Sequence, residues 1–346
     1  MRILALFVCV FLLNTSVLAQ YENDAFQSLN LSLSSRQAVL NQPLSIYNGD
    51  VENGINNPSM LNDGMYHKMS LNFVDYFADI NFISASYAFP LKQFGTIGVS
   101  VKSIGYGEFT QTDYTSQNLG NFNANEQIIS LGVSKRLSEK WVLGANLKTL
   151  FSNFESYQST AIASDLALAY TDVKNNFFMS LIAKNYGRQL STYASEKEDL
   201  PFHLDFGVSK RLEHLPFLFS LGYKNIERWD LTNPYEDTNS NLSPEPFSEK
   251  GFGAKLFRHI DLGGELSIGK RIQLRMGYNP RRRQELKLNS YLGMVGFSWG
   301  VGIKLSHFTI NYGRSTYHLH GSPNYFSFIT DFSKFYKKDE KNKHSN

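Results

Sequence analysis

The feature that most constrains the fold of this chain is a series of short segments in which apolar and polar residues alternate. In PFHLDFGVS, residues 201–209, Phe202 and Phe206 point to one side of the backbone, while His203 and Asp205 point to the other. Strict alternation predicts a β-strand, because successive side chains leave a strand on opposite faces. The pattern alone leaves open whether the phenylalanines form the core of a soluble sandwich or the lipid-facing side of a membrane barrel.

About fourteen such segments follow one another, each roughly ten residues long, which is the length that a tilted transmembrane strand needs. They lie at about 65–74, 79–89, 95–104, 125–135, 140–152, 158–170, 176–185, 201–211, 216–226, 257–269, 272–279, 291–304, 306–313 and 323–332. The connections between them alternate in length, with about 2 to 5 residues at one end of the sheet and up to about 30 at the other. Outer-membrane barrels sort their loops in this way, whereas a Greek-key sandwich has no reason to do so.

The sequence therefore predicts an all-β transmembrane antiparallel β-barrel of about fourteen strands, formed by residues 65–332. An even number of strands places both termini at the end with the tight turns, which is the periplasmic end of an outer-membrane barrel. The predicted location is the outer membrane, where the protein contacts lipid and lipopolysaccharide.

The first twenty residues, MRILALFVCVFLLNTSVLAQ, predict a secretory signal peptide. The uncharged run from Ile3 to Leu13 follows a basic residue and is too short for a transmembrane helix. We expect cleavage between Ala19 and Gln20, which makes residues 1–19 the signal peptide. Cys9, the only cysteine, lies inside that segment, so the mature chain is expected to have neither disulfides nor thiol chemistry.

The two segments that flank the barrel differ from it in composition. Residues 20–64 are polar and rich in Asn and Ser, and they end near NNPSML, a turn or helix-start signal. They are expected to form an N-terminal periplasmic or plug segment of turns with a short helix. Residues 333–346 contain KKDEKNKHSN and predict a charged, disordered tail.

Catalytic and metal-binding signals are weak, and the sequence predicts a protein that is not an enzyme and has no cofactor. SIGK, residues 267–270, matches the S-x-x-K pattern of serine β-lactamases but lies within a strand and lacks the companion elements. His318 and His320 in YHLHG have no third ligand at a suitable spacing, so no metal site is predicted. The net charge of +3 argues neither for nor against a nucleic-acid partner. Because the sequence shows no long basic face, no nucleic-acid partner is predicted. Lys148 and Asp165, on the polar faces of neighbouring strands, are expected to form a structural interior ion pair.

The predicted outer connections, about 104–124, 186–200 and 227–256, carry aromatic residues of the kind that anchor protein interfaces. A fourth connection, NPRRRQELK, holds three arginines that suit lipopolysaccharide phosphates or an acidic partner. The candidate partner-binding residues are Tyr106, Phe109, Tyr114, Tyr186, Tyr193, Trp229, Tyr235, Arg281, Arg282 and Arg283. Packing within the loops or in an interfacial girdle explains the aromatics equally well, and a solubilising charged loop explains the arginines.

Long stretches of the mature chain give a specific resemblance. They include GYGEFTQTDYTSQNLGNFNANEQIISLGVSKRL (105–137), GANLKTLFSNFESYQSTAIASDLALAY (144–170) and AKNYGRQLSTYASEKEDLPFHLDFGVSKRL (183–212). In these the chain resembles the PorQ family of outer-membrane barrels of the Bacteroidetes type IX secretion system, which is similar to FadL-like barrels. The resemblance implies a non-enzymatic barrel that holds a PorZ-like surface protein at the membrane, in an attachment complex with PorU and PorV.

Two other functions remain open from the sequence. A FadL-like outer-membrane transporter of hydrophobic compounds would use residues 20–64 as a plug, and it predicts an apolar pocket and a lateral opening in the barrel wall. A soluble envelope β-sandwich would instead bury the alternating apolar faces.

Overall fold

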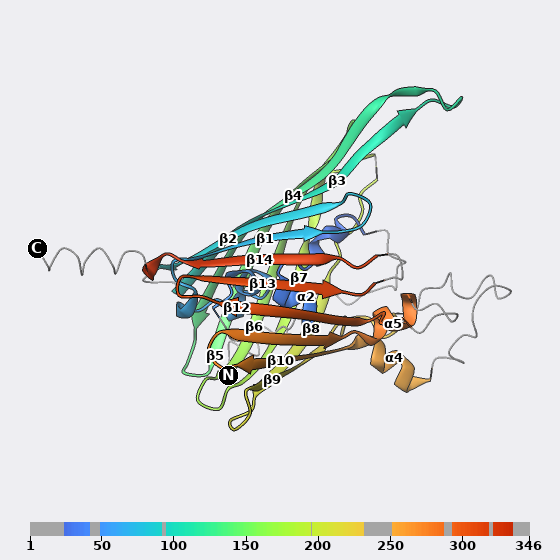
Figure 1. Ribbon diagram of the computed structural model, residues 1–346. Coiled ribbons are helices and arrows are strands. Elements are labelled where there is room, and N and C mark those ends of the chain that lie inside the picture. Colours follow the sequence, from blue (N-terminus) through green and yellow to red (C-terminus); the bar gives the residue numbers. More distant parts are fainter. Residues whose placement is uncertain are drawn as a thin grey trace, which may run out of the picture.

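The protein folds as a closed antiparallel β-barrel (Figure 1). The computed structural model describes residues 24–41, 49–91, 95–194, 196–231, 251–286, 293–317 and 321–334. Within these residues each strand pairs with its neighbours in sequence, and β1 pairs with β14 to close the barrel. The strands are β1 (Lys68–Asp75), β2 (Asn81–Leu91), β3 (Gly95–Thr112), β4 (Asn118–Arg136), β5 (Trp141–Phe154), β6 (Tyr157–Asp172), β7 (Phe177–Ser191), β8 (His203–Arg211), β9 (Phe217–Tyr223), β10 (Ile260–Ile268), β11 (Ile272–Tyr278), β12 (Phe297–Lys304), β13 (Phe308–Ser315) and β14 (Asn324–Asp331). The predicted fourteen-stranded barrel is confirmed.

The alternation seen in the sequence separates the outside of the barrel from its lumen. In β8, Asp205 and Ser209 are buried in the lumen, while Phe206 and Val208 face outward and remain partly exposed. Other strands also present large apolar side chains outward, among them Leu71, Phe73, Ile83, Val101, Ile129, Leu131, Leu147, Leu181, Phe219, Leu274, Trp299, Ile310 and Phe326. An apolar outer belt over a polar interior is the reverse of a soluble sandwich and suits a lipid environment.

The two ends of the barrel differ in their connections. The even-numbered connections are turns of three to five residues, and they define what we call the short-turn end. The connections after β7, β9 and β11 are longer and define the long-loop end, where α4 (Phe252–His259) and α5 (Pro280–Leu286) lie (Figure 1). No helix in the described part of the chain is both long and apolar enough to cross a membrane.

Two of the predicted outer loops are largely strand. The region predicted as loop 104–124 continues β3 to Thr112 and begins β4 at Asn118, so only residues 113–117 connect them. Likewise β7 extends to Ser191 and pairs with β6 there, which shortens the predicted loop 186–200. Apolar residues are sparse in these extensions, so they lack the regular apolar alternation from which strands are predicted.

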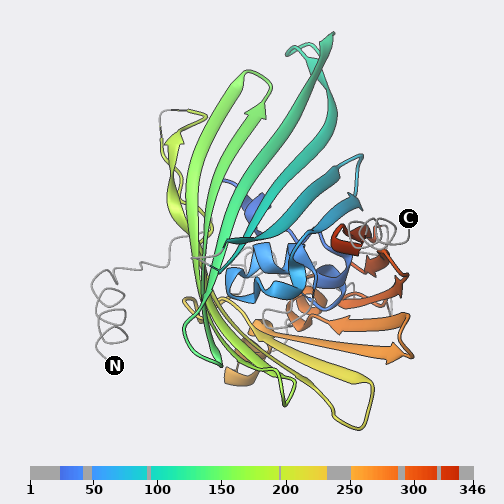
Figure 2. The same ribbon diagram turned by 90° about the vertical axis from the view of Figure 1, so that its left-hand side faces the viewer.

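The N-terminal residues 24–41 and 49–67, which we call the luminal segment, lie inside the barrel (Figure 2). They form η2 (Gln27–Asn30), α2 (Ser35–Val39), α3 (Val51–Asn56), η3 (Pro58–Met60) and η4 (Asp63–Met65). Hydrogen bonds join them to the strand wall along their length, among them Ser35 N to Ser327 Oγ at 2.9 Å, Asn57 Nδ2 to Ser180 Oγ at 3.0 Å, and Ser134 Oγ to the Leu61 carbonyl at 2.7 Å.

Glycines on the inward faces of the strands allow this close approach. A Cβ added to Gly277 of β11 would lie 1.8 Å from the Val39 carbonyl oxygen, and one added to Gly144 of β5 would lie 2.2 Å from the Ser59 nitrogen. Because both neighbours are backbone atoms, larger side chains at these positions would displace the luminal segment.

The described chain begins at the long-loop end, where the Ala25 amide donates to the Asp199 carbonyl in the connection after β7. The predicted periplasmic position of both termini stays a prediction, because the terminal residues themselves lie outside the described part of the chain. The signal peptide with its Ala19–Gln20 cleavage site, Tyr235, His318, His320 and residues 335–346 all lie outside the described residues.

Candidate functional site: a polar cavity in the lumen

Ion pairs between neighbouring strands line the lumen. The predicted pair between Lys148 of β5 and Asp165 of β6 is confirmed, with Nζ and Oδ2 2.7 Å apart and the Asp165 side chain fully buried. Asn146 and the Asn185 backbone amide also donate to Asp165, at 3.0 and 2.8 Å. The carboxylate therefore holds three strands, β5, β6 and β7, in one arrangement.

Other ion pairs join the luminal segment to the wall. Glu265 of β10 accepts from Arg36 of α2 at 2.8 Å, from Arg275 at 2.9 Å and from Arg211 at 3.1 Å. Glu52 of α3 pairs with Lys102 of β3 at 3.2 Å. Since removing one member of such a buried pair leaves an uncompensated charge, these contacts hold the segment against the strands.

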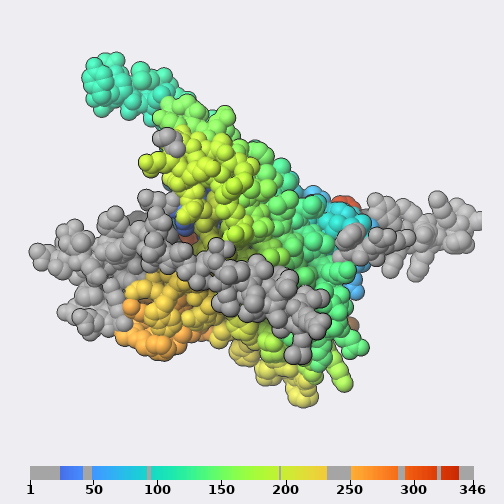
Figure 3. Space-filling model, turned by 180° about the vertical axis from the view of Figure 1, so that it is seen from behind, coloured from blue at the N-terminus to red at the C-terminus, as the bar shows by residue number. Residues whose placement is uncertain are grey.

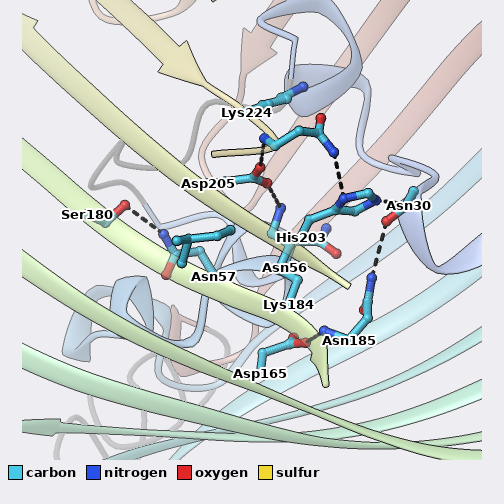
Figure 4. Close-up of polar contacts among 12 residues, drawn as sticks. Asn30, Asn56, Asn57, Asp165, Ser180, Lys184, Asn185, His203, Asp205 and Lys224 are labelled. Atoms are coloured by element: carbon cyan, nitrogen blue, oxygen red, sulfur yellow. Dashed lines mark hydrogen bonds and ion pairs between the residues drawn. The ribbon is translucent and has the colours of Figure 1, made fainter. Parts of the chain in front are cut away.

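A cavity of about 240 Å³ remains at the long-loop side of the luminal segment. Its walls come from η2, α2 and α3 on one side and from β5, β7, β8 and the start of the connection after β9 on the other (Figure 4). Amide and charged side chains predominate in the lining, which consists of Gln27, Leu29, Asn30, Leu31, Ser32, Gln37, Asn53, Asn56, Asn57, Lys148, Lys184, His203, Asp205, Lys224, Asn225 and Arg281. Among the described residues that line it, the His203 imidazole is the one aromatic ring.

Asp205 lies between two lysines of this cavity (Figure 4). Its Oδ2 is 3.1 Å from Lys184 Nζ of the neighbouring strand β7, and its Oδ1 accepts from the Asn225 backbone amide at 3.0 Å. Lys224 pairs instead with Asp261, at 2.5 Å. Because an ammonium group carries three donors, both lysines retain the capacity to bind an additional acceptor in the cavity.

His203 is fixed by amides rather than by a catalytic partner. Its Nε2 lies 2.9 Å from Asn30 Nδ2, and its Nδ1 lies 2.6 Å from Asn225 Nδ2 and 3.2 Å from Glu227. Asn30 in turn accepts from Asn185 Nδ2 at 3.1 Å, which connects η2 to β7. The network joins the luminal segment to both strands that border the cavity.

Of the aromatics predicted to bind a partner, two pack inward. The Tyr106 ring lies 5.4 Å from that of Phe154, and the Tyr193 ring lies 6.3 Å from that of Phe26 of the luminal segment. Burial raises the pKa of Tyr193 to about 12. Both residues thus contribute to packing at the mouth of the barrel.

Four others lie nearer the surface. Phe109 stacks on Phe122 at 5.3 Å, and Tyr114 is fully exposed at the tip of the β3–β4 hairpin. Tyr186 is 73% exposed on the outer end of β7. Trp229 stacks on the buried His259 ring at 5.7 Å. Partner binding at these residues stays a prediction.

The three arginines lie on α5 rather than in an irregular loop. Arg281 pairs with Glu285 at 2.7 Å and lines the cavity. The Arg282 guanidinium lies 4.0 Å from the centre of the Tyr317 ring, and Arg283 donates to backbone carbonyls, including that of Val295 at 3.3 Å. Their contacts stabilise the mouth of the barrel, so lipopolysaccharide binding by them also stays a prediction.

The sequence analysis did not single out several residues of the cavity, namely Lys184, Lys224, Asn30, Asn56 and Asn57, or Asn185, which binds Asn30. The alternation of β7 places Lys184 on the inward face, so its position in the lumen could have been predicted from the sequence. Nothing in the spacing of the chain shows that the luminal segment brings Asn30 and Asn56 to the same place.

Comparisons with known proteins bear on the fold. No family model and no curated protein matches the chain. The solved structure of a TodX monoaromatic hydrocarbon channel variant is similar to it, with a TM-score of 0.51, 12% identity, and coverage of 88% of this chain and 98% of that one. The Pseudomonas putida toluene transporter TodX gives a TM-score of 0.47, 10% identity and coverage of 86% and 96%. The solved structure of a Pseudomonas aeruginosa FadL homologue gives a TM-score of 0.49, 8% identity, and coverage of 87% of this chain and 99% of that one.

The likeness to the first of these structures extends over nearly its whole length, at an identity that carries information on fold alone. Together with the closed sheet and the apolar outer belt, it assigns the architecture. The chain has the fold of this channel variant, a closed antiparallel β-barrel.

Proposed function

We propose that this protein is an outer-membrane transport barrel in which the luminal segment acts as a plug and the cavity holds the solute. The cavity carries the proposal, because it lies in the lumen between the plug and the strand wall, on the path that a solute takes. The fold supports it, since similar solved structures are named as a hydrocarbon channel and a toluene transporter.

The lining of the cavity indicates the class of solute. Amides and ammonium groups that face a cavity lose hydrogen bonds with water when an apolar molecule displaces it, and each unpaired group costs about 1 to 3 kcal/mol. A small polar solute, in contrast, replaces those bonds. Lys184 and Lys224 favour a solute that carries acceptor oxygens.

Transport of a hydrophobic compound is the alternative that the named structures suggest, and one observation favours it. Strand β7 pairs with β8 only as far as Lys184↔His203, so residues 185–191 have β6 alone as a partner. The barrel wall is interrupted there. Side-chain bonds close part of the interruption, such as Asn185 Nδ2 to the Pro201 carbonyl at 2.9 Å. Such an interruption is the kind of lateral opening that the hydrophobic alternative requires.

Uptake by proteoliposomes distinguishes transport of a polar solute from transport of a hydrophobic compound. The purified barrel is reconstituted, and entry of radiolabelled succinate, arabinose and toluene is compared with that into protein-free vesicles. We expect succinate to enter faster than in the protein-free control, and toluene to enter at the control rate. Accelerated entry of toluene alone would support the hydrophobic alternative, and no accelerated entry of any solute would contradict transport.

A second candidate is the attachment role that the resemblance to the PorQ family implies, in which the barrel holds a PorZ-like surface protein together with PorU and PorV. The observation that favours it is the density of ion pairs between the luminal segment and the wall, which suits a barrel that conducts nothing. The similar solved structures give this role no support. Deletion of the loop 232–250 followed by membrane fractionation tests it, since release of a surface partner from an intact barrel is the expected result.

A further inference from the structure

The β3–β4 hairpin extends beyond the barrel wall at the long-loop end. The last pair between β2 and β3 is Asn81↔Gly105, and the pairing of β4 with β5 begins at Ala124↔Phe154. Strands β3 and β4 nevertheless stay paired with each other out to Thr112↔Asn118. Figures 1 and 3 show the tip of this hairpin standing clear of the neighbouring strands.

Both edges of the projecting hairpin are therefore open. Within the part of the chain that the structure describes, residues 106–112 of β3 and 118–123 of β4 have each other as strand partners and no third strand. An open edge presents backbone donors and acceptors that can pair with another chain, and native proteins normally cover or blunt such edges. Here the edge has neither a proline nor a lysine to block pairing.

The hairpin is nevertheless held in a defined conformation. A bulge at Tyr106 and Gly107 redirects it, with Gly107 at a φ of +87° and the Tyr106 ring packed on Phe154. Farther out, Phe109 stacks on Phe122, and Asn121 Nδ2 donates to Glu108 at 2.7 Å. Isolated two-stranded ribbons are marginally stable in water, so an ordered ribbon with both edges open is suited to receive a third strand.

The two edges differ in their surroundings. On the β4 side, Gln111 reaches across to Glu155 of the β5–β6 turn, at 2.8 Å. The β3 edge faces the space above the short β1–β2 connection, which Figure 2 shows between the hairpin and the blue strands. The β3 edge is thus the more accessible of the two.

The charge of the hairpin indicates what kind of strand fits. Between residues 105 and 125 the chain has two acidic residues, Glu108 and Asp113, and neither Lys nor Arg. Glu155 adds a third carboxylate beside it. A second copy of the same hairpin would bring like charges together, which is unfavourable, whereas a basic strand is attracted.

We propose that the β3 edge, residues 108–112, binds an extended basic segment of a partner protein as an added antiparallel or parallel strand. Backbone hydrogen bonds to the edge supply affinity, and the carboxylates select basic side chains. The exposed Phe109 side chain offers an apolar contact to the residue opposite it on the same face of the added strand. This inference rests on neither candidate function, since the hairpin lies outside the cavity.

A peptide-binding experiment tests the proposal with the full-length barrel in neutral detergent. The probe is a fluorescent ten-residue peptide that alternates lysine with valine and threonine. The control peptide has the same charge, with two central residues replaced by proline. We expect the first to bind at least tenfold more tightly than the second. Equal binding of both peptides would show attraction by charge alone and would overturn strand addition.

Variants and hydrogen exchange locate the site. Replacing residues 107–122 by a two-residue turn leaves the barrel strands intact and is expected to abolish binding, and Glu108→Lys is expected to weaken it about tenfold. Glu213→Lys, an exposed charge change in the turn after β8, is the matched control and should leave binding unchanged. Bound peptide should slow amide exchange in residues 108–112. Protection confined to residues 118–123, unchanged binding by the shortened variant, or hairpin-dependent dimers in sedimentation would each overturn the assignment.

Discussion

At the scale of single residues, buried carboxylates hold the lumen together. Asp205 shows this, because its side chain is 6% exposed and pairs with Lys184 while also accepting from the Asn225 backbone. The sequence placed Asp205 on the polar face of a strand, which is the face that lies inward in the barrel. It could not name Lys184 as the partner, since strand register across β7 and β8 depends on loop conformations that a period-2 pattern does not encode.

Replacement of Asp205 tests this role. Asp205→Ala leaves the Lys184 ammonium without its carboxylate and the Asn225 amide without an acceptor, and removal of one partner of a buried pair costs about 3 to 5 kcal/mol. We expect a loss of that size in the free energy of unfolding, measured by urea titration in detergent micelles. Asp230→Ala, which breaks an exposed pair with Lys255, is the control and should cost less than about 1 kcal/mol. Similar costs for the two variants would contradict the role of Asp205.

Asp113 sets the conformation of the hairpin tip. Its Oδ1 accepts from the Thr115 hydroxyl at 2.6 Å and from the backbone amides of Thr115 and Gln117 at 2.8 and 2.9 Å. The hydrogen bond from the Thr115 hydroxyl is the main cause that lowers the pKa of Asp113. A carboxyl whose pKa is lowered in the folded state stabilises the fold above its unfolded pKa, and the contribution disappears as pH falls through the folded pKa.

The tip is therefore expected to loosen in acid. Amide exchange at Thr115 and Gln117, corrected for intrinsic rates, should accelerate as the pH falls below about 4, the ordinary value for Asp. In Asp113→Asn the same amides should exchange at a rate that does not change over this range. A pH dependence that persists in Asp113→Asn would assign the effect to another group.

At the scale of elements, the strands were easier to predict than the luminal segment that they enclose. Amphipathic strands such as β8 and β11 follow from alternation, because lipid and lumen impose opposite polarity on their two faces. The outer ends of β3 and β4 carry only scattered apolar residues, namely Phe109, Leu119 and Phe122, so their pairing could not be predicted from alternation. The luminal segment was expected as a plug or periplasmic segment, and its short helices depend on contacts with distant strands rather than on local periodicity.

Close packing against glycine offers a way to loosen the luminal segment without breaking the barrel. Gly277→Ala places a methyl group where the Val39 carbonyl lies, so α2 must move away from β11. We expect the variant to insert and resist unfolding by detergent as a barrel, while its conductance in planar bilayers rises at least several-fold. Gly222→Ala is the matched inward-facing control, because its nearest neighbour, the Asp261 Cβ, lies at an ordinary 3.7 Å. Equal conductance in both variants would show that α2 does not limit passage.

At the scale of the whole molecule, the protein combines a lipid-facing exterior with a lumen that contains its own N-terminal segment. The sequence predicted the closed barrel from strand number and loop sorting, properties that many residues determine together. The cavity could not be predicted, because its walls combine residues near position 30 with residues near position 205. The polar lining of the cavity favours a polar solute, whereas the fold that the chain shares with other barrels does not determine the class of solute.

The central claim is that the luminal segment is a plug, which has to move before a solute can pass, and a reversible cross-link tests this most directly. Asn57 and Ser180 are buried side chains in direct contact, and the chain beyond Cys9 has no cysteine, so Asn57→Cys with Ser180→Cys places one pair of cysteines between η3's N-cap and β7. Loss of free thiols on oxidation verifies that the pair has formed a disulfide before uptake is measured. The measurement is succinate uptake by proteoliposomes that contain this variant, oxidised and then reduced. The account predicts uptake at the wild-type rate after reduction and at the protein-free rate after oxidation. Uptake that is the same in both states would contradict it.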